Sequence, residues 1–355
     1  MRMARLIWIA VLPAMLLSWV VLVSVDAIFA LLREVDEIGI GDYDAIKVLT
    51  YIALTLPRRA HDFFFGAAAV GLLVGLGGLA SSSQLIALQA AGAGRIRIAG
   101  WGLSVVGALL LVVLALGEWL GPAGDRLGNA LVTTARDQSA AVSGSGTWFK
   151  ERNAVWNAKF LHTPPAGVIE LWSVLRLQTD DEGRLQRIDR AARAVPIDGA
   201  WVLHDAERLV LKDGKVERTK FKRHELQSTL DAEQIAARVT GPRRQAPSEL
   251  IRSIRYARDN GLDPRNFESA LWFKLSYPLV VLSLCLLALP FCFGSLRTGG
   301  LGKRIFLGMA LAICFHYFHR AIINYGEAQG YSLGLVYVVP PLIVAAYGLR
   351  RLLRV

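Results

Sequence analysis

The feature that most constrains this fold is a set of apolar runs long enough to cross a lipid bilayer. A helix rises about 1.5 Å per residue, so about 20 apolar residues span about 30 Å of hydrocarbon. Hydrophobic residues make up 54% of the chain and charged residues only 19%, which excludes an ordinary soluble domain. Six runs qualify, at residues 6–32, 58–80, 98–121, 270–293, 304–325 and 331–349. We therefore predict a polytopic α-helical membrane protein with six transmembrane helices.

Basic residues in the short connections predict the orientation, because Lys and Arg collect on the cytoplasmic side. With the N-terminus inside, the cytoplasmic segments hold ten basic and no acidic residues, namely Arg2, Arg5, Arg95, Arg97, Arg297, Lys303, Arg304, Arg350, Arg351 and Arg354. The first outer segment, 33–62, holds six acidic and four basic residues. Both termini are thus predicted to be cytoplasmic. These ten charges give the net charge of +11 a local explanation, and no basic stripe interleaved with aromatic residues points to nucleic acid.

The segment between the third and fourth spans has a different composition. Residues 125–266 carry 24 of the 40 basic and 19 of the 29 acidic residues, and no cysteine. Residues 168–178 and 201–211 are strand-like, and turn signals occur at TDDEG, PIDG and KDG. This pattern indicates an antiparallel sandwich or jelly roll outside the cytoplasm, followed by a capped helix over 247–262. We divide the chain into 1–122 (spans one to three), 123–266 (the β domain and return helix) and 267–355 (spans four to six).

Residues 81–97, SSSQLIALQAAGAGRIR, connect the second and third spans. Ser81 to Ser83 are predicted to cap the first turn of a short helix at about 81–92. Leu85, Leu88 and Gly92 recur on one helical face. The residues alone fit two interpretations, an interfacial connector that turns the chain around or a surface that another protein contacts.

Several polar or small residues within the spans invite a functional hypothesis. His316 and His319 lack nearby carboxylates and make a poor metal site, so we predict a polar stripe facing a cavity or the outer interface and no metal. Asp26 is predicted to face the protein interior. Gly71 and Gly75 have the spacing that permits close helix contact.

Sequence motifs for catalysis or nucleotide binding are not met. The stretch RTGGLGKR places Arg297 and Arg304 where a phosphate-binding loop requires Gly and Ser or Thr. No serine-hydrolase or zinc-protease pattern is present either. We predict no catalytic residues and no cofactor bound by this chain.

An ordered set of motifs resembles the YjgP/YjgQ family of permeases of the lipopolysaccharide export system. The motifs are GDYDA (41–45), SSSQLIALQAAG (81–92), GEWLGPAGD (117–125), LWFKLSYPL (271–279), FCFGSLRTGGLGKRI (291–305) and VYVVPPLI (336–343). They lie throughout the membrane part of the chain, whereas the outer domain matches mainly by position and strand content. The resemblance implies three spans, a periplasmic β-jellyroll and three further spans in the bacterial inner membrane.

The resemblance also implies partners and a substrate. The chain would pair with an LptF-like permease on an LptB-like ATPase dimer that uses ATP and Mg, with LptC-like and LptA-like proteins forming a periplasmic bridge. The substrate would be lipopolysaccharide. Such an amphiphile requires an apolar membrane cavity and a sheet with an apolar groove.

The family's functional positions map onto two groups of residues. The coupling helix, which contacts the ATPase, maps to Ser83, Gln84, Leu85, Leu88, Gln89, Ala91 and Gly92. The substrate cavity maps to Phe29, Arg33, Phe64, Phe65, Phe315 and His316. Gln84 departs from the acid usual in the family, and a neutral hydrogen bond is about half as strong as a charge-assisted one. Lysines that meet lipid phosphates are also missing; Arg33 is the nearest substitute, while Arg58 and Arg59 are either further candidates or interfacial anchors.

A second function class stays open at this point. A membrane-anchored assembly or sensing protein would bind partners through its periplasmic β domain and transport nothing. The coupling segment distinguishes the two, because only the transporter requires an ATPase contact there.

Overall fold

The computed structural model describes residues 2–135, 140–141, 147–151, 153–162, 170–180, 182–197, 200–212, 215–228, 235, 241–293 and 301–354. Two compact units are distinguished by their internal packing. The helical unit contains residues Met1–Leu32, Thr55–Gly124 and Glu268–Val355, and the second unit contains Arg33–Leu54 and Asp125–Phe267. The second unit thus includes the β domain and the turn between the first two long helices.

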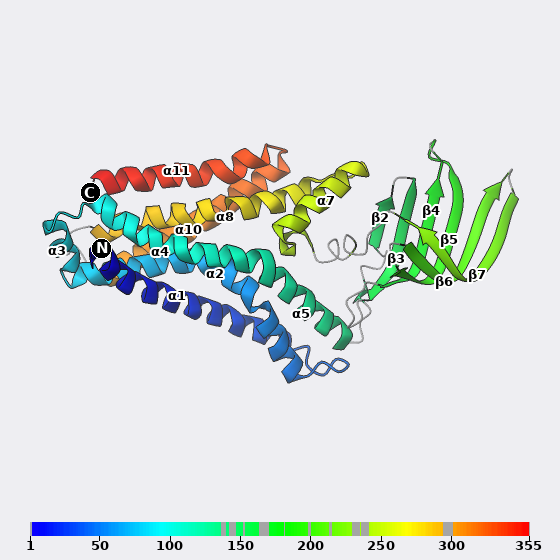
Figure 1. Ribbon diagram of the computed structural model, residues 1–355, viewed down its shortest axis with the longest axis horizontal. Coiled ribbons are helices and arrows are strands. Elements are labelled where there is room, and N and C mark those ends of the chain that lie inside the picture. Colours follow the sequence, from blue (N-terminus) through cyan, green and yellow to red (C-terminus); the bar gives the residue numbers. More distant parts are fainter. Residues whose placement is uncertain are drawn as a thin grey trace. The chain divides into compact units, whose positions relative to one another are not determined.

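Among the described residues, six helices are long and apolar enough to cross a membrane, and Figure 1 shows them. The described helices are α1 (Arg2–Val35), α2 (Ala45–Ser81), α3 (Gln84–Ala90), α4 (Arg95–Ala115), a π-helical turn (Leu116–Leu120), α5 (Gly121–Ala135), α7 (Pro247–Asp259), α8 (Arg265–Ala288), α9 (Pro290–Phe293), α10 (Leu301–Ala328) and α11 (Leu333–Arg354). The prediction of six spans is confirmed. Most of the helices extend past the predicted apolar runs, and α2 begins 13 residues before its predicted span, because the stretch that begins at Ala45 is helical too.

Close contact between α1 and α2 organises the helical unit. A Cβ atom at Gly71 would lie 2.3 Å from Cα of Met15, and one at Gly75 would lie 2.7 Å from Cα of Val11. No larger residue fits at either position without moving α1. The two glycines therefore let the helix backbones touch, as their spacing predicted.

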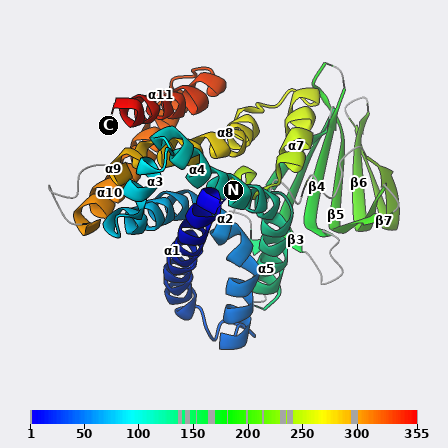
Figure 2. The ribbon, with the colours of Figure 1, turned by 60° about the vertical axis from the view of Figure 1, so that its left-hand side comes forward.

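The β domain is one antiparallel sheet of seven strands. The strands are β1 (Ala140–Ala141), β2 (Thr147–Glu151), β3 (Ala154–His162), β4 (Glu170–Thr179), β5 (Leu185–Ile197), β6 (Ala200–Lys212) and β7 (Lys215–Gln227). From β3 to β7 each strand pairs with the next in the chain, while β1 and β2 both pair with β3. Figure 2 shows β4 to β7 side by side. The strand-like segments 168–178 and 201–211 correspond to β4 and β6.

Backbone pairing is interrupted along one row that crosses the whole sheet. The pattern of partners skips one position in each of the pairs β3–β4, β4–β5, β5–β6 and β6–β7. We call this row the fold line; it consists of Lys159, Ser173, Ala192, Asp205 and Lys222. Ser173 and Asp205 have φ angles of 53° and 48°, in the left-handed region that non-glycine residues seldom occupy.

The fold line changes which residues face the core. Side chains on a regular strand alternate, so residues two apart share a face. Across the fold line, however, residues three apart share the buried cluster: Leu171 with Val174, Ala191 with Ala194, and Leu203 with Ala206. The strands therefore turn toward the same interior on both sides of this row.

The two halves of the sheet pack against each other. Trp156 on β3 and Trp201 on β6 are both buried, and their ring centroids lie 6.2 Å apart. Trp156 lies in the row that contains Arg176, Asp189 and Arg208. Trp201 is seven residues from Arg208 along β6, which is more than about 20 Å in a flat sheet. The ring contact thus requires the sheet to fold over on itself.

The predicted inserted antiparallel β domain is confirmed, and its sandwich character has an unexpected origin. The two layers are halves of a single meander that bends at the fold line. From β3 to β7 the described strands form a meander, in which each strand pairs with the next one in the chain. The predicted helix over 247–262 is confirmed as α7, where the Glu249 carboxylate accepts a hydrogen bond from the Ala246 backbone N–H and Gly261 ends the helix at φ 61°.

The left-handed backbone at Ser173 leads to a stability prediction. Ser173→Gly should preserve or raise the melting temperature of the purified chain, because glycine adopts this conformation without steric cost. Ser173→Val should lower the stability, because a β-branched residue adopts this conformation less readily than serine does. The control is Thr219→Gly on the regular part of β7, where glycine should destabilise by about 0.5–1 kcal/mol. Equal losses for glycine at both positions would contradict a strained fold line.

Candidate functional site

The short helix α3 follows α2 directly and is anchored by its apolar face. Leu85 and Leu88 are 3% and 7% exposed and pack in the main core cluster of the helical unit with Leu79, Ala93 and Ile98. The helix ends at Gly92, whose φ of 88° is left-handed. The two termini of the chain lie at the same end of the helical unit as α3 (Figure 1).

The predicted serine cap of α3 is wrong. Ser83 precedes the helix with a φ of 60°, and its side chain makes no capping hydrogen bond. The Ser81 and Ser82 hydroxyls instead donate to the backbone carbonyl of Gly78, at 2.9 and 3.0 Å. These serines therefore complete the last turn of α2 rather than begin α3.

The opposite face of α3 is available for contact with another protein. Gln84, Ala87 and Ala90 are exposed, and Ile86 is 59% exposed. The predicted coupling residues thus divide into two groups. Leu85 and Leu88 hold the helix on its own bundle, whereas Gln84 and Ala91 are exposed. Exposed Ile86 was not among the predicted residues, because its position lies off the apolar stripe.

The residues predicted to line a substrate cavity are only partly brought together. His316 on α10 stacks on Phe65 of α2 with centroids 4.3 Å apart, and the neighbouring Phe315 is buried in a cluster that Phe65 also contacts. Phe64 points elsewhere and packs edge-on against Trp19 of α1. Phe29 is 58% exposed near the end of α1. Their predicted contact with substrate stays a prediction.

The two histidines of α10 lie against aromatic rings. His316 stacks on Phe65, and His319 stacks on Phe315 with ring centroids 5.6 Å apart. His319 is 5% exposed, so at this position the helix turns its imidazole into the bundle. The glycine-rich stretch 294–300, which includes Arg297, lies outside the described residues.

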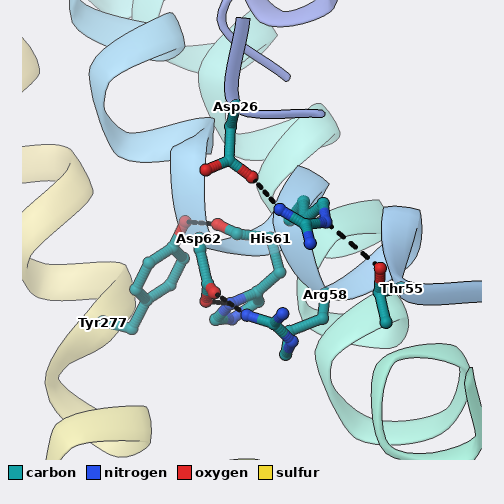
Figure 3. A network of polar contacts seen from close by, with 7 residues as sticks. Asp26, Thr55, Arg58, His61, Asp62 and Tyr277 are labelled. Atoms are coloured by element: carbon teal, nitrogen blue, oxygen red, sulfur yellow. Dashed lines mark hydrogen bonds and ion pairs between the residues drawn. The ribbon is translucent and has the colours of Figure 1, made fainter. Parts of the chain in front are cut away.

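A polar network joins α1, α2 and α8 (Figure 3). Arg59 is 5% exposed and pairs with the Asp26 carboxylate of α1, while its Nε donates to the Thr55 hydroxyl at 3.1 Å. Asp26 therefore faces the interior, as predicted. Arg59 is occupied by this pair and is not presented for a lipid phosphate.

The same network extends from α2 to α8 and to the π-helical turn that follows α4. Arg58 pairs with Asp62 at 3.1 Å, and the Tyr277 hydroxyl of α8 donates to the backbone carbonyl of His61 at 2.5 Å. The His61 ring stacks on Tyr277, and Gly117 lies so close that a Cβ there would be 2.6 Å from the imidazole. Gly117 belongs to the π-helical turn of the third span, a deviation often found at functional positions.

A second polar cluster, which sequence patterns did not predict, lies inside the β domain. The Asp189 carboxylate on β5 accepts hydrogen bonds from Arg176 on β4 at 3.2 Å and Arg208 on β6 at 2.7 Å. These three residues are direct neighbours across the sheet. Arg208 also contacts the His224 ring at 2.8 Å. The cluster joins the two halves of the folded sheet, because Arg208 and His224 lie on opposite sides of the fold line.

Six membrane-length helices, an inserted antiparallel β domain and a short anchored helix after the second span define a polytopic membrane protein with an inserted β domain. The chain belongs to the lipopolysaccharide export system permease LptF/LptG family, which matches residues 5–354. The resemblance drawn from the ordered motifs is thereby confirmed.

Two relatives extend over nearly the whole chain. The lipopolysaccharide export system permease protein LptG of Escherichia coli strain K12 is 27% identical over 346 residues, which cover 96% of this chain and 92% of that protein. The protein of the same name from Haemophilus influenzae is 26% identical over 348 residues, covering 96% and 93%.

The cluster in the β domain predicts a pH dependence. Burial, and then the charge of Arg208, lower the pKa of His224 below its ordinary value. The unfolded chain therefore takes up this proton near pH 6.5 while the folded chain resists it, so stability should fall as pH drops through this value. Melting temperatures of the wild type and of His224→Gln, measured from about pH 7.5 to 5.5, should converge at the acid end. His204→Gln is the control for loss of an imidazole, and an unchanged slope in His224→Gln would contradict the assignment.

Proposed function

We propose that this chain is a permease subunit of an ABC transporter that extracts lipopolysaccharide from the inner membrane and passes it to a periplasmic bridge toward the outer membrane. The observation that carries the proposal is the family match over residues 5–354, with relatives of that function covering more than nine-tenths of both lengths. In this proposal a separate ATPase, rather than the permease, hydrolyses ATP with Mg.

The proposed orientation places the α3 end of the helical unit in the cytoplasm. Arg2 and Arg5 begin α1, Arg95 and Arg97 begin α4, and basic residues also end α11. The excess of basic residues at these helix ends favours the cytoplasmic side. The β domain then lies in the periplasm.

The exposed face of α3 is the proposed contact with the ATPase. An amphipathic helix whose apolar face is buried in its own bundle transmits force, because displacing it displaces the core that holds it. Gln84 and Ile86 lie on the opposite, exposed side. An apolar side chain in the middle of such a face suits an apolar groove on the partner.

Substrate contact is proposed for the exposed apolar face of α1. Leu17, Val20 and Ile28 are each more than half exposed on one side of this helix, and Phe29 is 58% exposed on the side that meets α2. Arg33, in the last turn of α1, is also exposed and remains the candidate for a lipid phosphate. Phe64 and Phe315 would reach a lipid only if the helices around them separated, since they are 0% and 7% exposed.

The proposed assembly follows the family. An LptF-like permease would complete the cavity, an LptB-like ATPase dimer would bind the coupling helices, and LptC-like and LptA-like proteins would receive the lipid. The rival function, an assembly or sensing protein, lacks a specific observation in its favour and differs by needing no ATPase contact at α3.

The coupling contact can be tested with the same new side chain at two positions of α3. Ile86→Glu should reduce the ATPase that co-purifies with the complex by about tenfold, because a carboxylate would be desolvated in an apolar groove. Gln84→Glu should preserve or strengthen the contact, since the family usually has an acid there. Lipopolysaccharide release should follow ATPase binding in both variants.

Leu88→Glu is a weaker test of the contact, because Leu88 is buried in the bundle and the variant would disturb the fold itself. Full co-purification and export by Ile86→Glu would contradict the coupling assignment and favour the rival function.

A further inference from the structure

The helix α1 is held along much of its length by α2. Contacts occur at Val11 with Gly75, at Met15 with Gly71 and, farther along, at Asp26 with Arg59. The residue numbers of each pair rise on α1 while they fall on α2, as expected for two antiparallel helices. From Val11 to Asp26 the contact extends about 22 Å at 1.5 Å per residue.

Directional interactions fix the axial register of α1 against α2. The Trp19 indole N–H donates to the backbone carbonyl of Ala60 at 2.7 Å, and the Trp19 ring packs on Phe64. Arg59 is only 5% exposed and its charge is met by Asp26. A buried cation separated from its carboxylate is strongly disfavoured, so the two helices resist separation at this point.

The other side of α1 has no such contact among the residues that the structure describes. Its exposed apolar face includes Leu17, Val20 and Ile28, which helical spacing places away from Val11 and Asp26. Besides α2, α1 bonds to α4 through Trp8, whose indole donates to the Ser104 hydroxyl at 3.0 Å. Both helices that hold α1 are therefore the two that flank α3.

We infer that α1 and α2 move as one rigid hairpin, in which Asp26 and Arg59 are positioning residues that transmit displacement of α3 to the exposed face of α1. This inference depends on the proposed function, because it assigns α3 to the ATPase contact. Neither residue needs to touch the substrate or the nucleotide.

The test uses the full transporter reconstituted in vesicles containing lipopolysaccharide, with two readouts, ATP hydrolysis and lipid released per ATP. Asp26→Arg places two cations together and should lower lipid released per ATP by about tenfold while hydrolysis continues. The charge swap, Asp26→Arg with Arg59→Asp, should restore the ratio. Failure of the swap at normal protein level would show that Arg59 is needed in its own place, and would overturn the inference.

A second route disturbs the same contact without changing charge. Gly71→Ala forces a methyl group against the Met15 backbone, whereas Gly78→Ala meets open space on the same helix. Gly71→Ala should lower lipid released per ATP, and Gly78→Ala should not. If hydrolysis and export fall together in proportion to folded protein, the residues are merely structural and the inference is wrong.

Rigidity itself can be measured with spin labels at Leu17 and Val74, which are both exposed, in a chain carrying Cys314→Ser. The α1–α2 distance should stay constant between nucleotide-free and nucleotide-bound states. A change in this distance would overturn the rigid hairpin even where Ile86→Glu has upheld the ATPase contact. Failure of the Ile86 test alone would instead overturn the proposed function.

Discussion

The backbone contact between α1 and α2 is the interaction on which the helical unit depends most. Lipid offers no hydrophobic drive between helices, so association rests on close packing and on satisfied polar groups. Gly71 and Gly75 supply the first, and Asp26 with Arg59 supplies the second. These two contacts depend on each other. The ion pair forms only if the helices are close, and the glycine contact persists only if buried Arg59 keeps its carboxylate partner.

Buried charged groups of the β domain are also paired, here between neighbouring strands of the folded sheet. Asp189 receives Arg176 and Arg208 from the two neighbouring strands, and all three lie on the inner face of the folded sheet. The carboxylate offsets part of the cost of placing two guanidinium groups there. The contact of Arg208 with His224 then ties this cluster to the other half of the sheet. The Arg208–His224 hydrogen bond thus links the two halves of the sheet, in addition to the bent strands that connect them.

Sequence patterns predicted the features that depend on local composition. Apolar runs gave the six spans, the spacing of Gly71 and Gly75 indicated a close helix contact, and the capped pattern over 247–262 gave α7. The features that the sequence patterns did not predict depend on contacts between residues far apart in the chain. Leu85 and Leu88 form an apolar stripe, yet a stripe does not reveal whether it packs on its own bundle or on a partner. Arg59 meets Asp26 across 33 residues, and the fold line carries no glycine that would have marked it.

The length of α2 has a mechanical consequence. The polar network around residues 55–62 holds the helix to α1 and α8, while α3 begins about 22 residues farther on, which is about 33 Å along the axis. With that network as a pivot, α2 forms a lever arm whose α3 end moves about 2 Å for a tilt of three to four degrees. A tilt of a few degrees at the polar network therefore corresponds to a displacement of about 2 Å at α3. Conversely, a groove on the proposed ATPase partner that moves α3 by this distance would tilt the whole α1–α2 hairpin.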